Sequence, residues 1–244
     1  MIKKIITLFK LGRKIAKSDI LSITSKFKKP PLGISMLFQL LSFSFQKKEQ
    51  SKFNKDEGER LSSSLQSMGT TFIKLGQFLA TRPDIIGEEL SLKLEKLQDR
   101  LPPFSINQAK EIIKNDLGND IYNSIIDLSE PIAAASVAQV HKAKINDNGT
   151  IKDVAIKILR PEIKKIFNEE IDAIMLFAFI IESFIKKTKR LKLVEVVFLL
   201  KEITNLEMDL RFEAAAAAEY AENTKNDAGF KVPQIYWNFT SENV

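Results

Sequence analysis

Two strand-like stretches joined by a tight turn constrain the fold more than any other part of the sequence. Residues 137–145 and 154–159 are rich in β-branched residues and bring apolar and polar side chains to opposite faces. Between them lies Asn146-Asp-Asn-Gly149, whose residues tolerate the positive φ angles of a hairpin turn. Pro161 ends the second strand. The sequence therefore predicts a β-hairpin.

Helical patterns lie on both sides of this hairpin. From residue 57 to about 128, apolar residues recur every three or four positions, with a halt at Arg82-Pro83-Asp84. Ser105 is placed to cap a helix that starts there. Two long helices are expected over about 162–184 and 194–223. Strands and helices that are segregated in this way predict an α+β fold.

The composition excludes several kinds of active site. The chain has no cysteine, which removes disulfides, thiolate metal sites and cysteine nucleophiles. His141 is the only histidine, so a multi-histidine metal centre is impossible and any serine-histidine-carboxylate triad would depend on it. With 44% apolar residues, the 244-residue chain can bury an ordinary core in one or two domains.

The net charge of +6 is concentrated near the N-terminus. Residues 1–55 carry thirteen lysines and arginines against two acidic residues, so the rest of the chain is mildly acidic. The apolar run 31–45 among these lysines is shorter than the roughly 20 residues that cross a bilayer. It is expected either as an interfacial helix on an anionic membrane surface or as a core helix with solvated lysine flanks.

Two further expectations follow from patterns of apolar and basic residues. The apolar run 174–185 is interrupted by Glu182 and is too short to span a membrane, so we expect a buried core helix. Nucleic acid is not expected as a partner, because the basic segment lacks an aromatic interleaving or a recognition-helix pattern.

A run of small residues precedes the first strand. It comprises Ala133, Ala134, Ala135 and Ser136, and Val137 follows as the first residue of the strand. Small side chains would let a phosphate approach the backbone N–H groups closely, although the same residues also suit a close-packed turn in an ordinary sheet.

Lys157 lies in Val154-Ala-Ile-Lys157, which has the form of the kinase strand lysine that contacts nucleotide phosphates. Ala155 shares its strand face and would leave space for an adenine ring. Glu213 is the preferred ion-pair partner of Lys157, on a helix where Asp209 lies four positions earlier on the same face. Alternatively, Lys157 reaches solvent and Glu207 pairs with Arg211 one turn later.

Together these motifs resemble the UbiB/ADCK group of atypical protein-kinase-like proteins. Lys74-Leu-Gly-Gln77 looks like its lysine-any-glycine-glutamine motif, Ala133–Ser136 like its alanine-rich loop, and Glu207 with Asp209 like its glutamate-any-aspartate motif. The resemblance implies a kinase-like N-terminal lobe that binds ATP and Mg²⁺, with nucleotide contacts from 133–137, Ala155, Lys157 and Glu213. It also implies that Lys74 and Gln77 lie over the active site, which favours ATPase or small-molecule chemistry over protein phosphorylation.

The resemblance further implies a role in ubiquinone (coenzyme Q) biosynthesis. Expected partners are the membrane surface and either ubiquinone-biosynthesis enzymes or prenylphenol lipid precursors, with the protein peripheral on the cytoplasmic face of a bacterial inner membrane and without a transmembrane helix. The alternative is a non-catalytic module that binds lipid or a partner enzyme and keeps a vestigial nucleotide pocket.

The family's catalytic-loop aspartate and metal-binding Asp-Phe-Gly do not occur in the sequence. We therefore expect no catalytic residue and no metal ligand in this chain, and a truncated form that is inactive alone unless a separately encoded lobe completes it. The expected domains are a basic segment at 1–55, a helical extension at 56–128 and a partial kinase-like lobe at 129–244.

Overall fold

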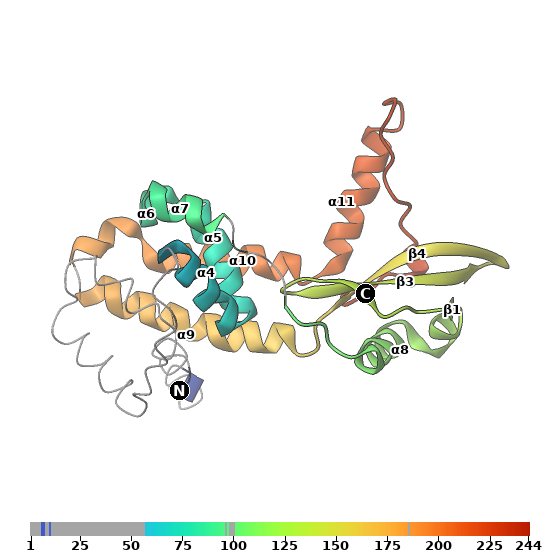
Figure 1. The fold of residues 1–244 in the computed structure, drawn as a ribbon, viewed down its shortest axis with the longest axis horizontal. Coiled ribbons are helices and arrows are strands. Elements are labelled where there is room, and N and C mark those ends of the chain that lie inside the picture. The colour runs from blue at the N-terminus through green and yellow to red at the C-terminus, as the bar shows by residue number, and fades with distance from the viewer. Residues whose placement is uncertain (1–5, 8–9, 11–56, 96, 98–100, 185) are drawn as a thin grey trace. The chain divides into compact units, whose positions relative to one another are not determined.

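The computed structural model describes residues 6–7, 10, 57–95, 97, 101–184 and 186–244. The chain folds into two compact units, and each unit is made of two separate stretches of sequence (Figure 1). The first contains Met1–Asp99 and Lys165–Lys201, and the second contains Arg100–Lys164 and Glu202–Val244. Apart from three positions, the basic segment 1–55 with its apolar run lies outside the described residues. The domain boundaries expected from the sequence stay a prediction.

In the first unit, short helices follow one another where the sequence predicts helical structure. They are α4 (Glu57–Met68), α5 (Thr70–Ala80), α6 (Pro83–Ile86) and α7 (Glu88–Leu94). The apolar repeat continues across Gly69, but the helix is interrupted there. Gly69 has a φ of 97°, which is not helical, and it separates α4 from α5. Pro83 occupies the first turn of α6, where its missing N–H leaves no hydrogen bond unmade.

Two longer helices also contribute to this unit, with a 3₁₀ turn, η2 (Lys186–Leu191), between them. They are α9 (Ile163–Phe184) and α10 (Leu193–Glu207). Lys201 Nζ lies 3.1 Å from Asp172 Oδ1, and Val194 N donates to Glu182 Oε1 at 3.3 Å, so the two helices run antiparallel. The predicted helix around 174–185 is present, but it is not wholly buried, since Phe179 is 60% exposed. Among the described residues, no helix has both the length and the apolar character to cross a membrane.

The second unit is built on an antiparallel sheet. Its strands are β1 (Ile125–Ile126), β2 (Pro131–Ala134), β3 (Ala138–Asp147) and β4 (Thr150–Leu159), and β3 pairs with all the others. Asp147 pairs with Thr150 across a two-residue turn in which Asn148 and Gly149 have φ angles of 50° and 85°. The hairpin predicted from the sequence is therefore confirmed, with the primed turn that suits the twist of its strands. The predicted α+β fold, with a small antiparallel sheet and helices, is confirmed as well.

The sheet of the second unit has two different faces. On one, here called the core face, side chains of β3 and β4 pack against α8 (Ile106–Asn123), which begins at the predicted Ser105 cap. This cluster contains Ala109, Ile113, Ala143, Ile156, Ile158 and Val244. The other, here called the open face, carries Ala155 and Lys157 and lies toward α11 (Leu210–Asn223). Figure 1 shows α8 and α11 on opposite sides of the sheet.

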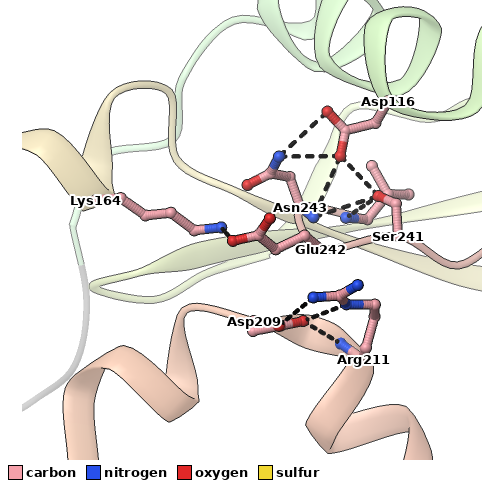
Figure 2. Close-up of polar contacts among 8 residues, drawn as sticks. Asp116, Lys164, Asp209, Arg211, Ser241, Glu242 and Asn243 are labelled. Atoms are coloured by element: carbon pink, nitrogen blue, oxygen red, sulfur yellow. Dashed lines mark hydrogen bonds and ion pairs between the residues drawn. The ribbon is translucent and has the colours of Figure 1, made fainter. Parts of the chain in front are cut away.

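After a 3₁₀ turn, η3 (Trp237–Phe239), the segment Ser241–Val244 returns to α8. The carboxylate of Asp116 accepts hydrogen bonds from Ser241 Oγ at 2.7 Å and from Asn243 Nδ2 at 2.9 Å (Figure 2). It also accepts a longer bond of 3.3 Å from Asn243 N. This carboxylate therefore anchors the segment to the helix beneath the core face.

The same segment also fastens the sheet to α11 through backbone hydrogen bonds. Leu159 N donates to Asn243 O at 2.9 Å, and Leu210 N donates to Glu242 O at 3.0 Å. The carboxylate of Glu242 forms an ion pair with Lys164 (Figure 2). Residues 241–244 thus connect α8, β4 and the first residue of α11.

Candidate nucleotide-phosphate site

The ion pair predicted between Lys157 and Glu213 is present. Lys157 Nζ lies 2.5 Å from Glu213 Oε2, and the two side chains are 38% and 60% exposed. An ion pair as open as this adds at most about 1 kcal/mol to stability, so its value lies in where it holds the lysine. An ammonium group has three donors. Lys157 can therefore keep its glutamate partner and still donate to an anion.

Ala155 lies beside Lys157 on the open face, as alternation along β4 predicts. Across the strand pair, Lys157 is opposite Val140 and Ala155 is opposite Lys142. Ala155 is exposed and presents only a methyl group. At this position, the strand therefore presents no large side chain next to the lysine.

The alanine-rich run forms the turn between β2 and β3, and part of it is itself a strand. Ala133 pairs with Val140 and Ala134 with Gln139, so the run lies before β3, as the sequence predicts, and its first two alanines belong to the short strand β2, which the sequence did not indicate. Residues 135–137 make the turn. None of residues 133–137 has a positive φ, so alanine fits here without the backbone strain that would require glycine.

The turn lies at the end of the sheet to which Lys157 is closest. Ala138, the first residue after the turn, pairs with Leu159, two positions beyond the lysine. The backbone of the turn and the ammonium group are thus brought to one end of the sheet. This is the arrangement that a phosphate contacted by both would need.

Arg160 is a residue of this region that sequence reasoning missed. Its Nε and Nη2 donate to the carbonyl oxygen of Ala135 at 3.0 and 2.8 Å, and its backbone N donates to Val137 O at 2.9 Å. The only sequence signal is an arginine between a strand and Pro161, which is too common a pattern to identify a role.

Asp209 does not share a helix face with Glu213, which corrects the sequence interpretation. The expected helix 194–223 is interrupted after Glu207, and Asp209 is the N-cap of α11 with φ −127° and ψ 100°. Its side chain accepts a hydrogen bond from Arg211 N, which satisfies a donor of the first turn. Asp209 therefore lies at the break between α10 and α11.

Arg211 also forms an ion pair with the side chain of Asp209, with Nη2 to Oδ2 at 2.7 Å (Figure 2). The hydrogen bond from the Arg211 side chain lowers the pKa of Asp209 below its usual value, and the charge of Lys164 adds to this effect. Glu207 is exposed at the end of α10.

Lys74 and Gln77 belong to the first unit, on α5. Both are partly buried, and their spacing puts them on one side of the helix. Between them, Gly76 has a packing role, since a Cβ there would lie 2.6 Å from Leu97 Cδ2 and 2.8 Å from Leu65 Cδ1. The expected position of Lys74 and Gln77 over a nucleotide stays a prediction.

His141 is a buried member of the core face. Its Nδ1 lies 2.7 Å from Ser129 O and its Nε2 lies 2.9 Å from Gln139 Nε2. Both ring nitrogens are engaged, and the side chain is 0% exposed. A triad built on the one histidine of the chain is therefore excluded.

The donor set suits a phosphate better than a metal ion. In the part of the chain that the structure describes, no three carboxylate or histidine side chains are grouped so as to hold a metal. Lys157 and the backbone of the turn 135–137 supply donors that an anion could accept from, and among the described residues we assign Mg²⁺ no ligand.

Residues 96–244 match the ABC1 atypical kinase-like domain. The chain is 38% identical over 188 residues to the probable protein kinase UbiB of Marinobacter nauticus and 34% identical over 215 residues to that of Cellvibrio japonicus. These alignments cover 77% and 88% of the chain but 34% and 38% of the relatives, so the chain spans little more than a third of their length. The chain belongs to the ABC1 atypical kinase-like family.

Proposed function

We propose that the second unit holds the phosphates of ATP in a UbiB-type atypical kinase or ATPase that supports ubiquinone biosynthesis. The observation that carries the proposal is the Lys157–Glu213 ion pair beside the turn 135–137. The order of these features along the chain supports it, as does the similarity to proteins named probable protein kinase UbiB.

The chemistry of the site follows from charge and geometry. Glu213 holds the Lys157 side chain on the open face, which fixes the cation before a ligand arrives. The ammonium group then binds phosphate oxygens, while N–H groups of the turn other than that of Ala135, which is bonded to Ala138 O, contact the same anion from the backbone. ATP supplies the phosphoryl group when it is bound, and these residues bind and orient it.

Location and partners belong to the same proposal. We assign the protein to the cytoplasmic face of the bacterial inner membrane as a peripheral protein. Its basic segment 1–55 would meet anionic lipid there, close to ubiquinone-biosynthesis enzymes or prenylphenol lipid precursors. Because the sequence contains no Asp-Phe-Gly, we expect a purified 1–244 chain to hydrolyse no ATP.

Equilibrium binding of Mg-ATP to the 1–244 chain tests the proposal. The unaltered chain should bind the nucleotide and be thermally stabilised by it, and Lys157→Ala should remove both effects. Lys152→Ala is the matched control, because Lys152 is an exposed lysine on the same strand, five residues before Lys157 and opposite Ile145. The absence of binding by the unaltered chain would instead favour a non-catalytic module with a vestigial pocket.

A further inference from the structure

Arg160 gathers an unusual set of acceptors at the end of β4. Its guanidinium donates to the carbonyl oxygens of Ala135, Pro102 and Leu101, at distances from 2.8 to 3.3 Å. All three acceptors are neutral backbone groups. The side chain therefore binds the turn before β3 and the linker before α8 with one planar group.

The geometry of these bonds suits arginine and no other side chain. Nε and Nη2 converge on the Ala135 oxygen, while Nη1 and Nη2 reach the two linker carbonyls. A guanidinium presents five donors in a rigid fork, whereas a lysine ammonium is a single point of charge. A lysine at this position would keep the charge and lose the simultaneous contacts.

The turn is held from more than one side. Ala135 N donates to Ala138 O at 2.8 Å while the oxygen of Ala135 faces the guanidinium. The backbone N of Arg160 also donates to Val137 O at 2.9 Å. Both ends of the turn are thus fixed to the residue that follows β4.

We propose that Arg160 is a positioning residue that sets nucleotide affinity by holding the turn 135–137 in its phosphate-binding conformation before the ligand arrives. This inference rests on the proposed function of the same site. Pre-ordering a loop raises affinity because the ordering entropy is not lost on binding. Arg160 contacts no ligand in this role; it acts through the carbonyl of Ala135 and the backbone of Val137.

Mg-ATP binding to the full 1–244 chain, measured by titration calorimetry, tests the inference with Arg160→Lys. The Kd should rise about tenfold or more, which corresponds to about 1.4 kcal/mol. Asp116→Ala is the control, because it also removes a side chain that makes four hydrogen bonds in the second unit, but on the α8 side of the sheet. It should lower the unfolding midpoint at least as much as Arg160→Lys while leaving the Kd within about twofold of the unaltered chain.

Hydrogen exchange of the unaltered chain gives a second test that does not require the variant to fold. The amide of Ala135 should be protected without nucleotide, and Mg-ATP should change its protection little. An unprotected amide that becomes protected only with Mg-ATP would overturn the inference. So would an equal loss of affinity in Asp116→Ala, since that result indicates general loosening.

The results separate this inference from the proposed function. If the unaltered chain does not bind Mg-ATP, or if Lys157→Ala binds it equally well, the proposed function fails. If Lys157→Ala loses binding but Arg160→Lys keeps the original Kd within twofold, the function stands and the positioning role of Arg160 is rejected.

Discussion

The two faces of the sheet in the second unit use the same strands for opposite purposes. On the core face, Ile158 is 0% exposed, and the polar groups of Gln139 and His141 are bonded inside the protein. On the open face, Lys157 and Glu213 form a pair that is largely exposed to solvent. Adjacent residues of β4 thus alternate between packing in the core and the ligand binding that we propose for the open face. The comparison predicts that substitutions on the two faces separate stability from binding.

The largest loss of stability is expected at Ile158. Ile158→Ala removes three buried carbons and leaves a cavity against α8, which should lower the free energy of unfolding by about 2–5 kcal/mol. Urea denaturation followed by circular dichroism measures this change. The neighbouring Lys157→Ala should lower it by less than about 1 kcal/mol. Equal losses in the two variants would break the distinction between the faces.

A smaller loss is expected at Gln139, which joins the core face to the linker before α8. Its side chain accepts from Phe104 N at 3.0 Å and donates to Phe104 O at 3.2 Å. Gln139→Ala leaves those groups and His141 Nε2 without this partner and should lower the free energy of unfolding by about 1–3 kcal/mol. The same denaturation experiment measures it. An unchanged unfolding midpoint would show that water replaces the side chain at no cost.

On the open face, the effect should appear in binding and hardly in stability. Glu213→Gln keeps the shape of the side chain and removes the charge that holds Lys157, so the Kd for Mg-ATP should rise about tenfold. The free energy of unfolding should change by less than about 1 kcal/mol. Calorimetric titration and urea denaturation of one preparation test both parts. A large loss of stability without a change in Kd would reverse the roles of the two faces.

The smallest effect is expected at Asp209, which starts the helix that carries Glu213. Because the pKa of Asp209 is lowered in the folded state, its charge stabilises the fold above the usual aspartate pKa of about 3.9. That contribution is lost as the pH falls through the lowered value. Asp209→Asn keeps a good cap and removes the charge. At pH 7, the free energy of unfolding of Asp209→Asn should be lower than that of the unaltered chain by well under about 1 kcal/mol. This difference should become smaller as the pH falls. Urea denaturation of both proteins at several pH values measures it.

Local patterns were sufficient to predict the hairpin and the capped helix. The turn Asn148-Gly149 and the cap Ser105 depend on a few adjacent residues whose backbone preferences are strong. The interruptions of the helices at Gly69 and Asp209 were not predicted from the sequence, although the sequence shows both residues. In each case an apolar repeat continues across the break, and the repeat alone does not show that the backbone leaves the helix.

The candidate site was predictable where family motifs mark it and not elsewhere. The pairing of Lys157 with Glu213 joins residues 56 positions apart and was predicted from their places in a kinase-like pattern. Arg160 was missed because its partners are backbone carbonyls, at Ala135 and in the linker 101–102. Any residue type can supply a carbonyl, so no side-chain motif indicates such a contact.

The segment 241–244 has a consequence for the order in which the second unit forms. The ribosome releases the β3–β4 hairpin early, and its pairing needs only neighbouring residues. The bond between Asp116 and Ser241 spans 125 positions, and Val244 reaches the α8 cluster only after the whole intervening chain has been made. During synthesis, part of the apolar surface of α8 therefore stays exposed to solvent until residues 241–244 have been made and have bound to it. The incomplete chain is prone to aggregation during that time.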